Sequence, residues 1–405
     1  MEKRAGLLRQ LGEVTYRLGD YNRAREYLEQ GLLLARTIGN NQLIARFLLD
    51  LGSIAGEQDD YNQQLDYFQK ALHATQNTND QKLLARNLHE LGMATGQLGN
   101  FDAARDYYQQ SLALGREINF KWAIAACLNG LGWLASLKGE HIAAREFFAE
   151  SLTHYRAIGD RRGTALGLNN LGSIARFHGD YATAQDYYEQ GLFIRQEIGV
   201  KWGIAASILN LGTVARLRGD NVTAREHFQK CLAIWQQAGA KWGIAQSVLN
   251  FGILSQQDGD YSAAREQFAR SLTLFREIHD DISTAVALIH VGLLDLDEGE
   301  TAVARQRLTE GLRTAAELGN TSFVLMAIAG LAHCCLMEKN FQSSAELVGL
   351  VAAHPALSAE VHTMQLEPVR AALTRLLSPD ELQTALAKGE AMEWETAVQS
   401  ILTER

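Results

Sequence analysis

The chain has 405 residues, with 38 Lys or Arg against 47 Asp or Glu, so its formal net charge is -9. That balance supplies no overall attraction to phosphate backbones or anionic membranes, and it argues against nucleic acid as a direct partner. The four cysteines form no CxxC pair and no disulfide framework, which is typical of the reducing cytoplasm, and each is interpreted as a small core residue. The N-terminus has no apolar core of signal-peptide length, and the longest uncharged run, residues 322–337, is short for a membrane span.

A Leu-Gly pair, or a close variant of it, recurs every forty residues along most of the chain without insertion or deletion. The pairs begin at Leu11, Leu51, Leu91, Leu131, Leu171, Leu211, Phe251 and Val291. Eight residues after most of these positions comes a glycine, which is followed by Asp, Asn or Glu. Glycine accepts the left-handed conformation that ends a helix, and Asp or Asn caps the next one. Each block is therefore predicted to be a helix, a tight turn and a second helix.

The pattern inside each block predicts how its two helices pack. Apolar or small residues recur at offsets 0, 3, 4 and 7 of the first helix, which places them on one stripe. The second helix alternates small and large residues, as in Ala184, Tyr188, Gly191 and Leu192. We expect the small residues to let the paired helices approach closely and the aromatic residue to fill the space between neighbours.

These recurring positions resemble the tetratricopeptide repeat. The resemblance covers about residues 3 to 353, with eight clear copies and a degenerate ninth, and the 40-residue period is similar to that of extended forms of the repeat. It implies an all-α fold, a right-handed superhelix of antiparallel helix pairs (an α-solenoid), whose inner wall is made by the first helices. Such an array gains its stability by stacking neighbouring hairpins.

The composition changes beyond residue 353, where all three prolines lie. Residues 354–405 are predicted to form two or three short helices that cap the array, with Pro368 and Pro379 near helix starts. The uncharged run of residues 322–337 lies in register with the repeats, and we expect the segment after it to cover it.

The tail also resembles the C-terminal ends of bacterial LuxR-type and STAND ATPase regulators, in the stretches Ala371 to Leu377, Glu381 to Gly389 and Met392 to Val398. This resemblance implies that the chain is the sensor arm of a larger signalling ATPase or transcription regulator, with an N-terminal nucleotide-binding domain as a partner in the same protein. The start of the chain at a block boundary, where the first helix has the stripe of an inner copy, favours the same interpretation.

The residue before the Leu-Gly pair is Asn170, Asn210 or Asn250 in three consecutive blocks. In the tetratricopeptide resemblance this position projects toward the inner wall. A ladder of amides at one-repeat spacing can bond the backbone of an extended peptide, because each amide both donates and accepts. The alternative is that each amide bonds a neighbouring helix and serves packing.

Other first-helix positions are expected to face the same groove or its edge, namely Asn129, Trp133, Asn169, Arg176 and Arg216. Arginine can hold a carboxylate through two parallel hydrogen bonds, and a tryptophan can act as an apolar anchor. The alternatives are solvated charges and a packed aromatic side chain.

Nearer the N-terminus, Arg46 with Asp50 and Arg86 with Glu90 are spaced four residues apart on the same wall. Such pairs usually satisfy each other as surface ion pairs, and they would also make this end of the groove polar. All four residues are candidate groove residues.

The sequence contains no GxxxxGK[ST], GxGxxG, HExxH or GxSxG motif, and its histidines are scattered. It therefore predicts no enzyme activity, no cofactor and no metal site. The favoured function is binding of a protein or an extended peptide in the groove. Two alternatives remain open: a sensor of a small molecule such as a sugar, as in related arrays of maltose-responsive activators, and a structural scaffold with no groove ligand.

Overall fold

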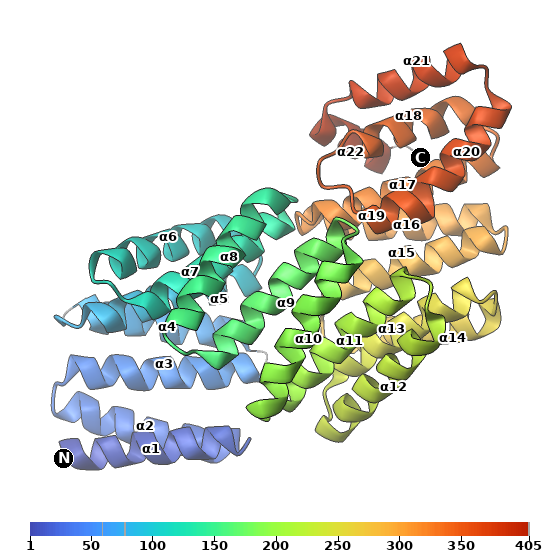
Figure 1. Ribbon diagram of the computed structural model, residues 1–405. Helices are drawn as coiled ribbons and strands as arrows, with labels where there is room; N and C mark the ends of the chain where they lie inside the picture. The colour runs from blue at the N-terminus through green and yellow to red at the C-terminus, as the bar shows by residue number, and fades with distance from the viewer. Residues whose placement is uncertain (59, 77, 404–405) are drawn as a thin grey trace. The chain divides into compact units, whose positions relative to one another are not determined.

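The computed structural model describes residues 1–58, 60–76 and 78–403, and every regular element in these ranges is a helix (Figure 1). The first helices of the hairpins are α1 (Glu2–Arg17), α3 (Asn41–Glu57), α5 (Gln81–Gln97), α7 (Lys121–Leu137), α9 (Arg161–Phe177), α11 (Lys201–Leu217), α13 (Lys241–Gln257), α15 (Asp281–Asp297) and α17 (Thr321–Met337). The second helices are α2 (Tyr21–Thr37), α4 (Tyr61–Gln76), α6 (Phe101–Glu117), α8 (His141–Ala157), α10 (Tyr181–Glu197), α12 (Asn221–Ala238), α14 (Tyr261–Glu277), α16 (Thr301–Glu317) and α18 (Phe341–Ala352). The predicted all-α solenoid of consecutive antiparallel helix pairs is confirmed.

The glycine of the Leu-Gly pair makes room for the aromatic side chain of its own hairpin. Phe228 of α12 is fully buried, and a Cβ atom on Gly212 of α11 would lie 2.6 Å from its ring. The same relation links Gly92 with Tyr108, Gly132 with Phe148, Gly172 with Tyr188, and Gly252 with Phe268. The predicted close approach of the two helices around a filling aromatic ring is confirmed.

The turn between α11 and α12 has the predicted cap geometry. Gly219 adopts a φ of +81°, in the left-handed region, and the Asp220 carboxylate accepts a hydrogen bond of 3.0 Å from the backbone N–H of Thr223. The turn thus satisfies an otherwise orphaned donor of the second helix.

The chain forms two compact units. Unit 1 consists of residues 1–134 and 146–163, and unit 2 of residues 135–145 and 164–405. The C-terminal helices therefore belong to the same unit as α10 to α18. The boundary between the units runs through the hairpin of α7 and α8, so that the first turn of α8 is part of unit 2.

In unit 2, short elements follow α18: α19 (Ala359–Val361), the π-helix η1 (His362–Leu366), α20 (Glu367–Leu376), α21 (Pro379–Glu390) and α22 (Trp394–Thr403). The prolines lie at the starts of α20 and α21, as predicted, and Ser378 and Glu381 form a capping box on α21. Figure 1 shows α20 and α21 beside α17 and α18. Most of the uncharged run in α17 is buried in this core, so the predicted covering of that run is confirmed.

In unit 1, α1 keeps the stripe of an inner helix but exposes it. Leu7, Leu11 and Val14 are 60%, 47% and 55% exposed, whereas the equivalent Leu51 and Ile54 of α3 are buried. The preceding hairpin supplies the cover in α3, because Gly31 of α2 packs on Phe47.

Candidate functional site

A cavity of about 420 Å³ opens in unit 2 on the side formed by its first helices. It is lined by the end of α7, the start of α8, one face of each of α9, α11, α13, α15 and α17, and residues 358–361. We call it the unit 2 cavity. Its walls combine aliphatic and aromatic side chains such as Leu249, Ile253 and Phe323 with amides, hydroxyls and a small number of charges. This mixture and this size are typical of a ligand site.

The residue before the Leu-Gly pair reaches this cavity in three successive repeats. These residues are Asn210 of α11, Asn250 of α13 and His290 of α15. The position is therefore a lining position, as the predicted ladder requires, but the three lining residues are one repeat further along than predicted. Asn170 of α9 is half-buried and is not among the described residues that line the cavity.

The asparagine amides also bond within the protein. Asn210 Nδ2 donates to Oδ1 of Asn169 at 2.8 Å, across two neighbouring first helices. Asn250, only 8% exposed, donates from Nδ2 to the backbone carbonyl of Gln246 at 2.9 Å. Each of these bonds uses one of the two N–H groups of an amide, so an amide in either place has further bonding capacity.

Two arginines and one glutamate are the charged side chains among the described residues lining this cavity. Arg216 of α11 has a side chain only 3% exposed, and its guanidinium donates to Oε1 of Glu360 at 2.7 Å. Arg176 of α9 lies 3.9 Å from the other oxygen of the same carboxylate. The Nε atoms of both arginines are buried and have no hydrogen-bond partner among the described residues. Burial alone would raise the pKa of Glu360, but the charges of Arg216 and Arg176 and the hydrogen bond from Arg216 outweigh it and hold that pKa below its usual value.

Glu360 reaches the arginines because the chain after α18 crosses the ends of three first helices. Ala356 is buried against Gly139, in the turn after α7. Ala359 lies on Gly179, in the turn after α9, with a separation of 3.1 Å from a Cβ built on that glycine. Val361 is buried beside them. Ser358, Glu360 and Val361 therefore lie in the lining of the cavity.

Two buried histidines complete the polar lining. Burial lowers the pKa of His290 to about 4 and that of His141 to about 4. The ring of His290 stacks on Phe268, and the ring of His141 stacks on Phe177. Both ring nitrogens of His141 are buried without a partner among the described residues. At neutral pH both side chains are uncharged, and each offers one donor and one acceptor.

The charged candidates of unit 1 pair differently from the prediction. Asp50 is bound by Arg9 of the preceding repeat, at 2.6 Å, and Arg46 lies 3.4 Å from Asp80, which caps α5. The predicted pair of Arg46 with Asp50 is therefore wrong, because side chains of neighbouring first helices reach one another more directly than residues one turn apart. Burial raises the pKa of Asp50, although Arg9 opposes the shift.

The predicted pair of Arg86 with Glu90 is also wrong. The Arg86 guanidinium lies over the Trp122 ring, 4.6 Å from its centroid, in a cation–π contact. Glu90 has His89 as its near neighbour, at 3.5 Å. The Trp122 ring binds Arg86 because a weakly hydrated guanidinium stacks well on an aromatic face.

Asn129 and Trp133 lie on α7 within unit 1. Asn129 is half-buried. Trp133 is 38% exposed, and its ring packs edge-on against Phe101 at 5.9 Å and covers Gly96. Trp133 is thus partly an exposed aromatic surface and partly a packed side chain.

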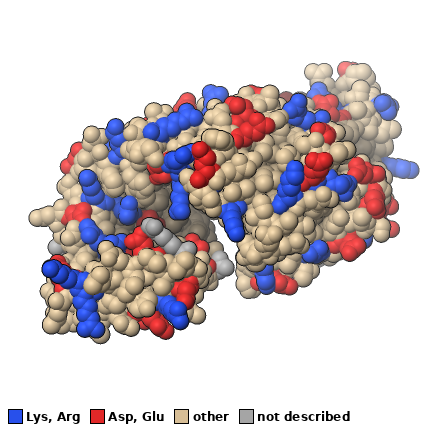
Figure 2. All heavy atoms as spheres, turned by 60° about the horizontal axis from the view of Figure 1, so that its bottom comes forward, with Lys and Arg blue, Asp and Glu red and all other residues tan. Residues whose placement is uncertain are grey.

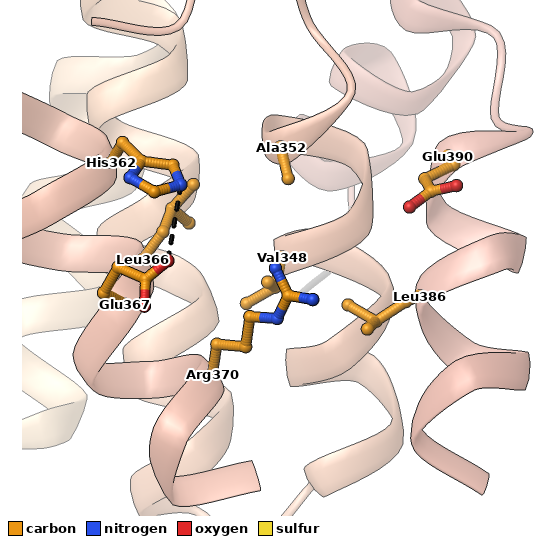
Figure 3. A pocket seen from close by; sticks show the side chains of 8 residues that line it. All are labelled: Val348, Ala352, His362, Leu366, Glu367, Arg370, Leu386 and Glu390. Atoms are coloured by element: carbon orange, nitrogen blue, oxygen red, sulfur yellow. Dashed lines mark ion pairs between the residues drawn. The ribbon is translucent and has the colours of Figure 1, made fainter. Parts of the chain in front are cut away.

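A second, much smaller hollow of about 40 Å³ lies between α18, α20 and α21 (Figure 3). Figure 3 shows Arg370 extended between Val348 and Leu386, while His362 faces Glu367, to which its Nε2 lies at 3.4 Å. These charges are paired or exposed beside aliphatic side chains, an arrangement that fits packing of the C-terminal helices on α18.

Surface charge and metal-ligand geometry give no further site. On the face shown in Figure 2, acidic and basic side chains are interspersed. Across the described ranges, no group of three or more His, Cys, Asp or Glu is arranged to hold a metal ion. The four cysteines are buried, as predicted. Searching the same described residues finds no helix with both the length and the apolarity needed to cross a bilayer.

Sequence reasoning missed Glu360 and His141 as lining residues. His290 occupies the ladder position one period after Asn250, and that position was expected to face the inner wall, but His290 was not singled out as a site residue. Glu360 could not have been found from the sequence, because it lies beyond the periodic part of the chain and contacts an arginine 144 residues away.

Comparison with known proteins identifies the repeat. The tetratricopeptide repeat family model matches residues 3–77, 43–117, 83–157, 124–197 and 204–277. A search of the curated proteins gives no match.

Solved structures share the fold at low sequence identity. A Rap protein complexed with Competence and Sporulation Factor aligns with a TM-score of 0.62 at 14% identity, over 96% of this chain and 100% of that one. The Rap conjugation gene regulator of plasmid pLS20, in complex with the Phr* peptide, aligns with a TM-score of 0.58 at 15% identity, over 68% of this chain and 75% of that one. Aspartyl phosphate phosphatase F from Bacillus subtilis gives 0.57 at 13% identity, over 71% and 75%. At such identity these likenesses show the fold alone.

Proposed function

Because this chain belongs to the tetratricopeptide repeat family, whose model matches most of it, we propose that it is a non-enzymatic module that binds a protein or an extended peptide segment. The ligand lies along the first helices of unit 2. The observation that carries this proposal is the single cavity lined by equivalent positions of α11, α13 and α15 together with Arg176 and Arg216. A backbone that runs past successive repeats would meet one polar side chain per repeat.

The roles of the lining residues follow from their chemistry. The amides of Asn210 and Asn250 bond the backbone of the segment, and His290 extends this row by one repeat. The aliphatic lining, with Leu249 and Ile253 among it, takes apolar side chains of the segment. The arginines bind an acidic group. Asn129, Trp133, Arg46, Asp50, Arg86 and Glu90 of unit 1, and Asn169 and Asn170 of unit 2, stay proposed groove residues, each within its own unit.

The solved neighbours support a peptide ligand. One of them, the pLS20 Rap regulator, is described in complex with a peptide. A peptide complex of a protein of the same fold makes a peptide the simplest ligand to propose for this chain.

A small-molecule ligand is the second candidate, and the volume of the unit 2 cavity favours it. A cavity of about 420 Å³ lies within the range of roughly 300 to 1,000 Å³ that small-ligand sites occupy. Native mass spectrometry of the chain as purified tests this candidate, because a retained metabolite adds a discrete mass that denaturation removes.

We further propose that the module is the sensor or regulatory arm of a larger cytoplasmic bacterial signalling ATPase or transcription regulator. The resemblance of residues 371–398 to the tails of such regulators supports this. The full reading frame of the gene tests it: a nucleotide-binding domain encoded upstream would bear the proposal out, and an upstream stop codon next to a promoter would reject it.

Peptide binding is tested by panning a displayed library of short linear peptides on the full chain and titrating the selected peptide. The double variant Asn210→Ala/Asn250→Ala should lose about 1 kcal/mol for each backbone hydrogen bond removed. Asn22→Ala, on the exposed surface of α2, is the matched control. Equal affinity of the wild type and the double variant would reject the ladder.

A further inference from the structure

The charges of the unit 2 cavity are not balanced. Arg176 and Arg216 bring two positive charges to one carboxylate, that of Glu360, while His141 and His290 are neutral at pH 7. The imbalance is deep in the protein, because Arg216 is only 5% exposed. A buried guanidinium with an uncompensated charge favours the approach of a second anion.

Buried polar nitrogens without hydrogen-bond partners also lie at the unit 2 cavity. Nε of Arg216 and Nε of Arg176 are buried without hydrogen bonds among the described residues, and so are both ring nitrogens of His141, which is 6% exposed. All three side chains line the cavity. Buried donors are almost always bonded in folded proteins, so three unbonded ones around a single cavity indicate a binding surface.

Glu360 lies in the first turn of an unbroken helical run, in which α19 leads through η1 into α20. A π-helical turn inside a helix is rare and is frequent at functional sites. The segment contacts the repeats through Ala356 on Gly139, Ala359 on Gly179 and the buried side chain of Val361. Its charged contact with the repeats is the ion pair of Glu360 with the arginines.

We propose, on the basis of the proposed function, that residues 354–361 act as an internal competitor in which Glu360 holds the arginine site, and that a ligand carboxylate enters by replacing Glu360 on Arg216 and Arg176. The displaced segment connects α18 to α20. Ligand binding is therefore coupled to release of the chain that leads into the C-terminal helices.

Competition with Glu360 lowers the affinity of the site for a ligand carboxylate. Neutralising Glu360 should therefore raise the affinity for carboxylates and leave the affinity for neutral ligands unchanged. The carboxylate can come from the end of a peptide, from an acidic side chain or from a free small acid, since the arginines read only the anionic group.

The experiment is hydrogen exchange of the full chain, followed at residues 354–361, with two probes that differ in one group. N-acetyl-leucine carries a carboxylate on an apolar body, and N-acetyl-leucinamide is its neutral match, with sodium chloride added to equal ionic strength. The acid should speed exchange of residues 354–361 in the wild type, and the amide should not. Equal effects of the two probes, or no effect of either, would overturn the proposal, and this comparison needs no substitution.

Variants give the second readout. Glu360→Gln should raise affinity for the acid on the order of tenfold, within the usual range of coupling between sites, and leave affinity for the amide as it is. Arg216→Gln should abolish the response of the segment to the acid. If Glu360→Gln does not fold, Arg176→Gln, which removes the longer of the two contacts, should weaken that response. Unchanged affinity for the acid in a folded Glu360→Gln protein would contradict the proposal.

The outcomes separate this inference from the proposed function. A panned peptide that binds the wild type and Glu360→Gln equally, without faster exchange of residues 354–361, leaves the module a peptide binder and removes the competitor. Faster exchange with the acid but no peptide from panning keeps the carboxylate site and favours a free small acid as the ligand.

Discussion

The side chains of Asp50 in unit 1 and Glu360 in unit 2 are nearly equally exposed, at 31% and 30%. Their carboxyl pKa values nevertheless shift in opposite directions. Burial raises the pKa of Asp50, and the charge of Glu13 adds to this rise. Arg9 from the adjacent repeat and Arg86 oppose it. The pKa of Glu360 is lowered, because two arginines outweigh the same burial effect. Asp50 is thus paired by the adjacent repeat, whereas the arginines of unit 2 are paired by a segment remote in sequence, which is where a ligand carboxylate is proposed to enter.

The largest expected effect is a difference in acid stability between the units. The histidines whose pKa burial lowers are His141, His227, His290, His333 and His354, and all of them belong to unit 2. A histidine held neutral in the fold takes up a proton more readily when unfolded, so stability is full above about pH 6.5 and is lost as the pH falls toward the folded value of about 4. As the pH falls through this window, His141 and His290 each lower the free energy of unfolding by up to about 3 kcal/mol.

Hydrogen exchange at pH 7 and pH 5 measures this difference, with exchange in the two units compared after correction for the intrinsic pH dependence. Unit 2 should lose protection before unit 1. His290→Gln should flatten the pH dependence of unit 2, while the same change at the exposed His73 of unit 1 is the control. Simultaneous loss in both units would break the comparison.

The second effect concerns the carboxylate of unit 2. Glu360→Gln leaves Arg216 buried without a full countercharge and should lower the free energy of unfolding of unit 2 by about 3 kcal/mol, at the low end for breaking a buried pair. Because the folded pKa of Glu360 is lowered, this contribution is present above about pH 4.5 and disappears at more acidic pH. Urea denaturation of the wild type and the variant at pH 7 measures the loss. A change under 1 kcal/mol would mean that the pair is no more than a surface contact.

A smaller effect is expected for the cation–π contact of unit 1. Arg86→Ala removes the guanidinium from the Trp122 ring and should cost about 1 kcal/mol, the value of such contacts near the surface. Arg86→Lys separates charge from stacking, since an ammonium keeps the charge but not the planar face. The thermal unfolding midpoints of the two variants are compared with that of the wild type. If Arg86→Lys lowers the midpoint as much as Arg86→Ala does, the contact is due to stacking of the guanidinium and not to its charge.

The smallest effect is expected at Asp50. Asp50→Asn should change the free energy of unfolding by at most about 1 kcal/mol, as for other partly exposed pairs, because burial already disfavours the charged form that Arg9 binds. Urea denaturation of Asp50→Asn and Glu360→Gln under the same conditions compares the losses in free energy of unfolding at the two carboxylates. Equal losses at the two carboxylates would remove the distinction between the units.

The repeat was predictable because its signals are local. Gly212 and Phe228 lie in one hairpin, and Gly219 and Asp220 mark its turn, so the forty-residue period alone predicts both contacts. The ladder position was predictable as a lining position for the same reason. The sequence did not predict which repeats contribute ladder residues to the cavity. That set depends on how the rest of the chain packs over the repeats.

The charge pairs were predicted wrongly because their partners lie one repeat apart and not one helical turn apart. Arg9 and Asp50 are one repeat apart, as are Asn169 and Asn210, so neighbouring first helices bring such side chains together across the wall. A search at a spacing of forty or so residues would have found them. The contact of Arg216 with Glu360 has no such signal, because its two residues belong to different kinds of structure.

The most direct test of the binding wall is a hydrogen-exchange footprint of the panned peptide on the full chain. The account predicts slower exchange in α11, α13 and α15 of unit 2, with the second helices α12 and α14 as internal controls that stay unchanged. Protection confined to those second helices, or to unit 1 alone, would contradict it.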